Sequence, residues 1–420
     1  MEVKIMSQIV AEQCRQAHSA RVEMGSLKSM IRSQALILMA KRLIQHQDLI
    51  IQANKVDLAA GKEAGISTAL LDRLTLTVER ISDMAKSLET IADLHDPIGD
   101  ILDGFVRPNG LKITKVRVPL GVIGIIYEAR PNVTADAIGL AIKTGNCVVL
   151  RGSASAYQSN KAIADILSTA ATDSGVPHGA IQLLEDTSRE SVKTFIQMKS
   201  YLSLLIPRGG ADLINHVVEH ATVPTIETGV GNCHVYVDQF ANLDTALSIC
   251  LNAKLHRPSV CNACESILVH QSIASVFLPK LIDSLHNRGV DVRGCSETAL
   301  FRSITPAQDA DWKTEYLDLT VAIKVVNTID DAIAHIAQHG SSHSEAIISQ
   351  DYEAITSFTQ AVDAASILVN ASTRFTDGGE FGFGAEMGIS TQKLHARGPM
   401  GINELTTYKY IVYGNGQVRI

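Results

Sequence analysis

One cysteine in this chain has neighbours that favour a reactive thiolate. Cys261 follows the turn His256-Arg257-Pro258 and precedes the strand-like run 265–269. Nearby cations lower the pKa of a thiol, and the thiolate is its nucleophilic form. We therefore hypothesise that Cys261 attacks an activated acyl group. The alternative is a small buried apolar side chain, the usual role of a lone intracellular cysteine.

Three further groups of residues have the spacing of metal or redox sites, and each has a simpler explanation. Cys264 forms a Cys-x-x-Cys pair with Cys261, but a zinc site would need a second such pair, so we assign Cys264 to packing. Residues 216–220 read His-Val-Val-Glu-His, a zinc pattern that also fits an ordinary amphipathic helix. The histidines at 335, 339 and 343 fit a helix end that faces solvent or substrate. We expect no metal site.

Two familiar nucleotide-binding patterns do not occur in the sequence. It contains no Gly-x-x-x-x-Gly-Lys-Ser/Thr loop, and no intact Gly-x-Gly-x-x-Gly follows a predicted strand. A kinase-like or ATPase function therefore has no support. We expect that any dinucleotide is held differently from the usual Rossmann manner.

Composition narrows the class of protein. A chain of 420 residues with 46% hydrophobic and 19% charged residues is typical of a globular protein with two or three domains. The net charge of −7 argues against general binding of nucleic acid. No apolar run is long enough for a membrane span, and no secretory signal is visible. The seven scattered cysteines do not form a disulfide pattern, so we expect a reducing cytoplasm.

Periodicity divides the chain into a helical opening, a hairpin and two stretches of alternating strands and helices. Apolar residues have helical spacing over 8–100, and residues 104–119 alternate around a Pro-Asn-Gly turn, which predicts a hairpin. The predicted strands are 122–127, 147–150, 181–184, 202–206, 222–226, 234–237, 267–270, 322–326, 345–349 and 367–369. Helices predicted between them are 159–172, 190–198, 211–220, 274–285, 329–338 and 352–361. This alternation favours parallel, doubly wound α/β sheets.

Parallel sheets of this kind bind ligands at the carboxyl ends of their strands. The residues predicted to lie at those ends in the first α/β stretch are 151–153, 185–186, 207–210 and 227–229. The end of the chain, 408–412 and then 417–420 after a Gly-Asn-Gly turn, predicts a terminal strand pair.

Several longer stretches resemble the aldehyde dehydrogenase superfamily, and together they extend over essentially the whole chain. They are 118–134, 143–152, 206–210, 227–234, 326–347 and 370–384. The resemblance implies an α/β aldehyde dehydrogenase fold with two doubly wound domains and a small β oligomerisation element. The expected NADP-binding domain is 1–103, 120–253 and 388–408, the catalytic domain is 254–387, and the oligomerisation element is 104–119 and 409–420.

The same resemblance implies a reaction. It is closest to the branch that reduces L-glutamyl 5-phosphate to L-glutamate 5-semialdehyde with NADPH, the second step of proline biosynthesis. Cys261 would displace phosphate to form a thioester, which hydride then reduces. The backbone N–H of Cys261 and the amide of Asn132 are the expected donors to the developing oxyanion. A homo-oligomer and functional coupling to glutamate 5-kinase are the expected associations.

Cofactor residues follow from the same resemblance. Arg151 and Ser153 match the place where the superfamily binds the adenosine ribose, and an arginine there suits the 2′-phosphate of NADP. Close to the pyrophosphate we expect Pro207, Arg208, Gly209 and Gly210, since glycine permits near approach. Glu315 resembles the glutamate that binds the nicotinamide ribose.

Substrate residues are expected to carry opposite charges. Arg374 would bind the α-carboxylate, and Glu345 or Glu128 the α-amino group, with His343 beside them. Glu227 matches the superfamily's general base for hydrolysis, a step that would waste the thioester in a reductase. We therefore expect a cofactor-contacting or structural role for Glu227.

Two alternatives remain on the sequence alone. One is a hydrolytic aldehyde dehydrogenase that acts on another aldehyde with Glu227 as base. The other is a catalytically inactive binding or scaffold protein. His256 and Arg257 have two open roles, lowering the thiolate pKa or receiving the departing phosphate.

Overall fold

A computed structural model describes residues 2–419, with the side chains of 8–67 and 70–419. The chain forms two compact units. The first comprises Met1–Glu227, Gly382–Gly388 and Met400–Ile420, and the second Thr228–Phe381 and Ile389–Pro399. None of the helices among the described residues is long and apolar enough to cross a membrane.

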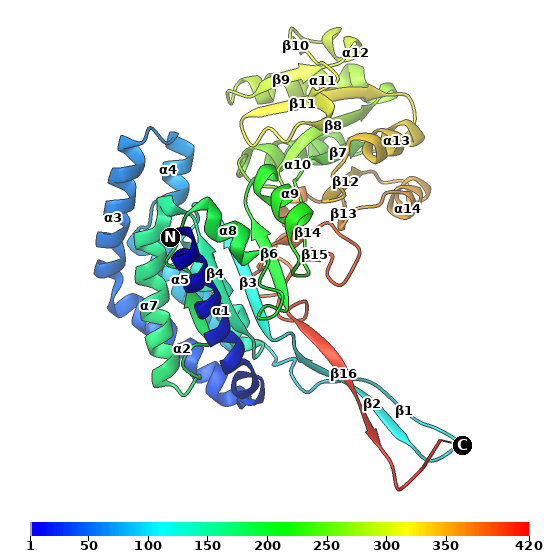
Figure 1. Cartoon of the computed structure of the whole chain (residues 1–420). Coiled ribbons are helices and arrows are strands. Elements are labelled where there is room, and N and C mark those ends of the chain that lie inside the picture. Colours follow the sequence, from blue (N-terminus) through cyan, green and yellow to red (C-terminus); the bar gives the residue numbers. More distant parts are fainter. Residues whose placement is uncertain (1, 420) are drawn as a thin grey trace. The chain divides into compact units, whose positions relative to one another are not determined.

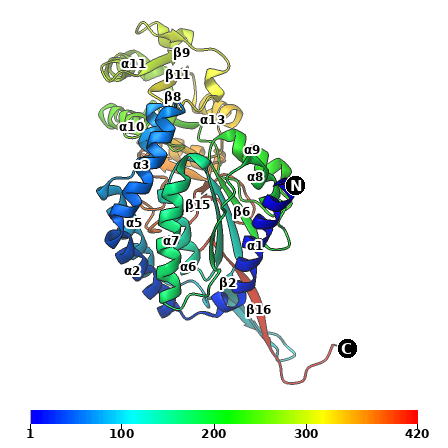
Figure 2. The ribbon, with the colours of Figure 1, turned by 60° about the vertical axis from the view of Figure 1, so that its left-hand side comes forward.

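The first unit opens with five helices, as the apolar spacing predicts. They are α1 (Glu2–Ser26), α2 (Ser29–Gln45), α3 (Gln47–Glu63), α4 (Thr68–Leu74) and α5 (Val78–Asp93). In α5, Ile81, Met84 and Leu88 recur at helical spacing and are buried, which places one apolar stripe against the core. The helices α2, α3 and α5 form an outer layer over α6 and α7 (Figure 1 and Figure 2).

A four-stranded parallel sheet, in the order β5-β4-β3-β6, forms the centre of this unit. Its elements are β3 (Val122–Tyr127), α6 (Asn132–Lys143), β4 (Cys147–Gly152), η1 (Ala154–Ala156), α7 (Tyr157–Asp173), β5 (Ile181–Leu183), α8 (Arg189–Phe195), β6 (Leu204–Arg208) and α9 (Ala211–His220). The chain runs from β3 to β5 in one direction and then crosses to β6. Because parallel crossovers are right-handed, α6 and α7 cover one face and α8 the other.

The strand predicted at 222–226 is wrong. Only one bridge forms there, between Thr225 and Leu205. Pro224 lies in the middle of the run and has no N–H to donate, so a regular ladder cannot continue through it.

A separate three-stranded antiparallel sheet, in the order β1-β2-β16, forms an extended arm of the first unit (Figure 1). The strands are β1 (Ile101–Val106), β2 (Lys112–Pro119) and β16 (Thr406–Tyr413). The predicted hairpin is confirmed, and Gly110 in its turn has φ of 88°, a value that favours glycine. The predicted terminal pairing is wrong, because β16 pairs along its whole length with β2. Of 417–420, residue 420 lies outside the described residues.

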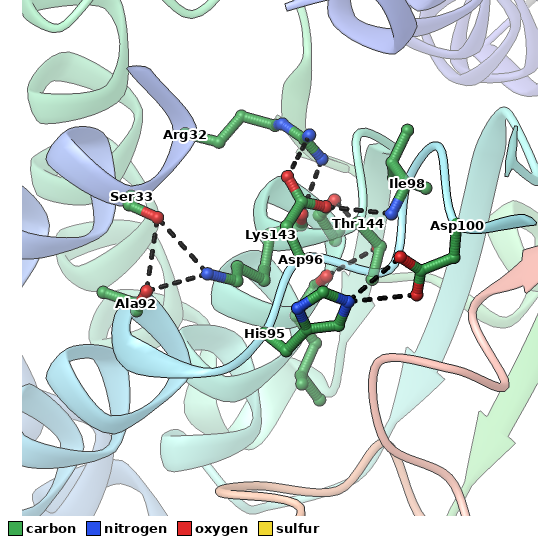
Figure 3. A network of polar contacts seen from close by, with 11 residues as sticks. Arg32, Ser33, Ala92, His95, Asp96, Ile98, Asp100, Lys143 and Thr144 are labelled. Atoms are coloured by element: carbon green, nitrogen blue, oxygen red, sulfur yellow. Dashed lines mark hydrogen bonds and ion pairs between the residues drawn. The ribbon is translucent and has the colours of Figure 1, made fainter. Parts of the chain in front are cut away.

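A buried polar network anchors the chain just before this arm (Figure 3). The Arg32 guanidinium donates to the Lys143 carbonyl at 2.7 Å and to the Asp96 carboxylate at 2.6 Å. The Lys143 ammonium donates to the Ala92 carbonyl at 2.7 Å, and Asp96 accepts from the backbone N–H of Ile98 at 3.0 Å. Helices α2, α5 and α6 are thereby tied to the segment that leads into β1.

The second unit is built on a seven-stranded sheet, in the order β10-β9-β11-β8-β7-β12-β13, whose pairings are all parallel. Its elements are β7 (Cys233–Val237), α10 (Leu243–Leu255), β8 (Cys264–His270), α11 (Gln271–His286), β9 (Asp291–Gly294), α12 (Ser296–Ala299), β10 (Thr305–Pro306), η2 (Asp311–Lys313), β11 (Thr320–Val326), α13 (Ile329–His339), β12 (Ser344–Ile348), α14 (Tyr352–Ala361), β13 (Ser366–Val369), η3 (Thr373–Phe375), β14 (Ile389–Ser390) and β15 (Gly398–Pro399).

Both faces of this sheet are covered. Val235 and Val237 of β7 pack into one apolar cluster with α10 and α11, while Tyr236 between them packs into another with α13 and α14. Successive side chains of a strand point to opposite faces, so a continuous apolar run serves two layers.

The division between the units differs from the boundary expected at residue 254. β7 is hydrogen-bonded to β8 and β12, so it belongs to the second sheet together with the helix that follows it. Near the end of the chain, residues 389–399 also belong to the second unit, although we expected them with the cofactor domain. Strand alternation alone does not reveal which sheet a strand joins.

We predict that Arg32→Met destabilises the first unit by about 3 kcal/mol, because it leaves the largely buried Asp96 without its cation. Amide hydrogen exchange of α2 and α6 in urea would measure the loss in this unit. The control is Arg15→Met, which removes an exposed pair with Glu12 and should change little. Equal effects of the two variants would contradict the assignment of the network as an anchor.

Candidate active site

Cys261 lies in the loop 256–263 between α10 and β8, at the amino-terminal edge of the seven-stranded sheet. It is partly buried, as is Cys295, whereas the other five cysteines are buried. Burial raises the pKa of the thiols of Cys14 and Cys147 to about 12 and that of Cys264 well above its ordinary value. Of the Cys-x-x-Cys pair, Cys264 is therefore an inert packing residue, as predicted, and Cys261 is the accessible one.

The backbone of Gly231 lies directly against this loop. A Cβ at residue 231 would lie 1.5 Å from the Cys261 carbonyl oxygen and 2.6 Å from its Cα, so only glycine fits there. The Sγ of Cys233 donates to the same carbonyl at 3.2 Å. The carbonyl of Cys261 is thus turned into the protein.

Two segments hold the Gly231 loop in this position. The N–H of Gly231 donates to Oε1 of Glu315 at 2.7 Å. The side-chain amide of Asn232 donates to the carbonyls of Trp312 and His339, each at 2.8 Å. The predicted ribose ligand Glu315 therefore stands one hydrogen bond away from the backbone that supports Cys261.

Arg374, the predicted substrate-binding cation, contacts the Cys261 loop. Its guanidinium donates to the side-chain oxygen of Asn262, and its Nε donates to Nδ1 of His256 at 3.3 Å. The side-chain amide of Asn262 donates in turn to the Thr376 carbonyl at 2.8 Å. His256 and Arg257 are exposed. His256 thus has a partner in Arg374, which the sequence did not indicate.

The predicted substrate residues Glu345 and His343 are both 0% exposed. Oε2 of Glu345 accepts from the backbone N–H of His234 at 2.8 Å and lies 3.0 Å from its Nδ1. Nδ1 of His343 lies 2.8 Å from the Ser344 hydroxyl. These side chains hold β7 and β12 and are not exposed in this structure, and their binding of a substrate amine stays a prediction.

Sequence patterns did not reveal the ion pair between Lys254 and Glu265. Both residues are 0% exposed, and Nζ of Lys254 lies 2.5 Å from Oε2 of Glu265. Burial raises the pKa of the Glu265 carboxyl to about 7, while the ammonium of Lys254 opposes the rise. The sequence gives little sign of this pair: Lys254 lies between Ala253 and Leu255, and Glu265 precedes the apolar run 267–269. Such charged residues are rarely buried unless they are paired.

Arg151 and Ser153 lie at the carboxyl end of β4 in the first unit, as predicted. Arg151 is 9% exposed. Its guanidinium donates to the carbonyls of Thr187 and Ser188, at 2.6 and 2.8 Å. Arg151 therefore holds the loop after β5. We expected only a contact with the 2′-phosphate of NADP and did not predict this structural role. The hydroxyl of Ser153 lies 2.9 Å from that of Ser155.

The run from Pro207 to Gly210 lies at the carboxyl end of β6 and leads into α9. The Arg208 carbonyl accepts from the N–H of Glu128 at 3.1 Å, and Oε2 of Glu128 accepts from the N–H of Gly210 at 3.1 Å. A Cβ at Gly209 would lie 2.7 Å from the Glu128 side chain, whereas at Gly210 it would meet nothing within 4 Å. Gly210 is therefore exposed at the start of the ten-residue helix α9, and its N–H already donates to the carboxylate of Glu128. Glu128 is thus a neighbour of the glycines in the first unit.

Asn132 is the first residue of α6 and is exposed. Its side-chain amide donates to the Asp136 carboxylate at 3.4 Å, and Asp136 accepts from the Ser87 hydroxyl at 3.0 Å. Burial raises the pKa of Asp136 to about 6, although part of the residue remains exposed and Arg208 opposes the rise. Asp136 thus orients the amide from the next turn of the same helix.

The remaining candidate motifs form no metal site in the described part of the chain. Nδ1 of His220 lies 2.9 Å from the His216 carbonyl, as in an ordinary helix. Among residues with described side chains, no group of three or more His, Cys, Asp or Glu could hold a metal ion. Glu227 is partly buried and ends the first unit's main segment.

We predict that Asp136→Asn removes a pH dependence of stability. Because the folded pKa lies above the ordinary value, the folded protein binds more protons and its free energy of unfolding falls as pH rises from about 4 to about 6. Unfolding in urea across this range should lack about 1–2 kcal/mol of that fall in the variant. Asp83→Asn, on the exposed face of α5, is the control and should keep the wild-type profile. The same profile in Asp136→Asn would refute the assignment.

Known proteins are similar to this chain over essentially its whole length. Residues 4–299 match the aldehyde dehydrogenase family. γ-Glutamyl phosphate reductases of Moorella thermoacetica and Halothermothrix orenii are 55% and 52% identical, each over 100% of both chains. A crystal structure of γ-glutamyl phosphate reductase from Thermotoga maritima has 46% identity and a TM-score of 0.95, over 98% of this chain and 100% of that chain. An acetylating aldehyde dehydrogenase from Geobacillus thermoglucosidasius shares the fold at 17% identity, with a TM-score of 0.72 over 100% of this chain and 99% of that chain. The predicted fold and family are confirmed: the chain belongs to the aldehyde dehydrogenase family, among its γ-glutamyl phosphate reductases.

Proposed function

We propose that this protein reduces L-glutamyl 5-phosphate with NADPH, giving L-glutamate 5-semialdehyde and phosphate, as the second step of proline biosynthesis. The names of its full-length relatives support this substrate. The observation that carries the chemistry is the partly buried Cys261 in a loop fixed by Gly231 and Glu315, among cysteines that are mostly buried.

Cys261 would act as the nucleophile. A carboxylate resists attack because it is anionic, whereas an acyl phosphate offers a leaving group. The thiolate sulfur bonds to the acyl carbon, the carbon–oxygen bond to phosphate breaks, and phosphate departs with the electron pair. The resulting thioester is reduced by the hydride that NADPH supplies, and expulsion of the thiolate releases the aldehyde.

Negative charge develops on the carbonyl oxygen in both steps. The backbone N–H of Cys261 and the side-chain amide of Asn132 are the proposed donors to it. Asn132 is exposed and is oriented by Asp136, so its amide is available to a substrate. Arg374 is the proposed cation for the substrate's α-carboxylate, since it is fixed to the Cys261 loop through Asn262 and His256.

The residues of the first unit fit NADPH in part. The proposed pyrophosphate site is the run Pro207, Arg208, Gly209 and Gly210, which leads into α9. Binding there would require the Glu128 carboxylate to give up its hydrogen bond from the Gly210 N–H. Ser153 and Glu315 are the proposed contacts of the two riboses. Arg151 already donates to two carbonyls. Its main proposed role is therefore to hold the loop beside the 2′-phosphate, and direct binding of the phosphate is secondary.

We further propose a homo-oligomer formed through the β1-β2-β16 sheet. β1 and β16 are its outer strands, so each leaves one edge without a partner among the described residues. Large apolar side chains are exposed on both strands: Ile101, Leu102, Phe105 and Val106 on β1, and Tyr408, Tyr410, Val412 and Tyr413 on β16. Long exposed edges with apolar side chains are usually covered by another chain.

The same proposal includes a compartment and a functional partner for the protein. The thiols, none of which forms a disulfide in the described part of the chain, fit a reducing cytoplasm. Functional coupling to glutamate 5-kinase would limit the time that the labile acyl phosphate spends in water.

The decisive experiment is phosphate dependence of the reverse reaction. We expect oxidation of L-glutamate 5-semialdehyde with NADP to require inorganic phosphate, because phosphate must attack the thioester. Cys261→Ser should lower the rate by at least about 1,000-fold, since an alcohol lacks the thiolate's nucleophilicity. Oxidation without phosphate that is lost in Glu227→Gln would instead establish the hydrolytic alternative, and full activity of Cys261→Ser would exclude the thioester.

Arg374→Gln should raise KM for L-glutamyl 5-phosphate by about 10- to 100-fold, the loss of one charge-assisted contact. Its KM for NADPH should change little. Arg302→Gln, which removes an exposed ion pair with Asp283 in the same unit, is the matched control. A change in kcat alone, with KM for the acyl phosphate unaltered, would show that Arg374 only supports the loop.

A further inference from the structure

The buried pair of Lys254 and Glu265 joins the two ends of the loop that carries Cys261. Lys254 lies in the last turn of α10 and Glu265 is the second residue of β8, so their contact closes the loop 256–263 at its base. Both side chains are 0% exposed. A buried ion pair is commonly no more stable than apolar residues of similar volume, so overall stability alone does not account for it.

Glu265 also holds a third segment. Its Oε1 accepts from the backbone N–H of Leu317 at 3.2 Å. Leu317 has φ of 54°, in the left-handed region that residues other than glycine rarely adopt. The hydrogen bond from this strained position fixes the chain two residues after Glu315.

A closed circuit of contacts results within the second unit. Glu265 fixes the segment that carries Glu315, Glu315 accepts from the N–H of Gly231 at 2.7 Å, and Gly231 lies against the backbone of Cys261. The Cys261 loop then returns to Lys254 and Glu265. One carboxylate therefore sets the position of both the proposed nucleophile and the proposed ribose ligand.

We propose that Lys254 and Glu265 are positioning residues. They fix the position of Cys261 relative to Glu315, so that both acyl transfer and cofactor binding depend on this pair. The inference rests on the proposed function of Cys261 and Glu315. Neither member of the pair is catalytic, because neither is exposed to substrate.

The main test replaces the pair by apolar residues of similar volume, Lys254→Met with Glu265→Leu. Removing both charges leaves no unpaired ion, although the Leu317 N–H loses its acceptor, so the unfolding midpoint in urea should fall by less than in Glu265→Leu alone. We expect kcat to fall by about 10- to 100-fold, because a shift of about 1 Å at the nucleophile has that effect. The KM for NADPH should rise, and the rate of Cys261 alkylation by iodoacetamide, followed by mass spectrometry, should change.

A second variant covers the case in which the double variant does not fold. Glu265→Asp keeps both charges but shortens the side chain by one methylene, so it should fold and show the same loss in kcat and rise in KM for NADPH. Arg32→Met, which breaks a buried pair in the first unit, is the control and should lower stability without changing kcat per folded molecule.

The proposal would be overturned if the folded Glu265→Asp variant or the folded double variant kept the wild-type values of kcat, KM for NADPH and the alkylation rate. Failure of the proposed function is recognised separately, because the wild-type enzyme itself would then lack phosphate-dependent oxidation of the semialdehyde.

Discussion

The second unit depends on a contact between two stretches of backbone. Gly231 lies so close to Cys261 that a Cβ at residue 231 would overlap its carbonyl. Neither loop can move alone, and each is held from its other side, one by Glu315 and the other by Asn262. If Cys261 is the nucleophile, as proposed, this support fixes the backbone from which its thiol extends, and acyl transfer depends on such positioning.

Burial separates residues that look alike in the sequence. Cys261 and Cys264 are three residues apart, yet only Cys261 is accessible. Glu315 and Glu345 are both expected ligand residues from the family resemblance, but Glu345 is buried against His234, while Glu315 is partly exposed. The distinction arises because a group must be reachable by a substrate before its charge can serve chemistry.

The two sheets place their candidate residues at opposite kinds of edge. In the first unit Arg151, Ser153 and Arg208 lie at or just after the carboxyl ends of β4 and β6. In the second unit Gly231 and Cys261 precede β7 and β8 and so lie at the amino-terminal edge. The general rule for doubly wound sheets therefore locates the proposed cofactor residues of the first unit but not the proposed nucleophile.

The sequence by itself determined the local structure and the family. Strands β3 and β4, the hairpin before Pro119 and helices such as α9 were predictable because their signals, apolar periodicity and turn residues, act within a few residues. The family motifs likewise pointed to Cys261, Asn132 and the run 207–210.

Only the tertiary structure decided that β7 joins the second sheet, that β16 pairs with β2 and that Arg151 donates to two carbonyls. It also brought Lys254 to Glu265 and Glu315 to Gly231. Partners far apart in the chain leave no periodic pattern, because their pairing is selected by packing and by the need to satisfy buried polar groups.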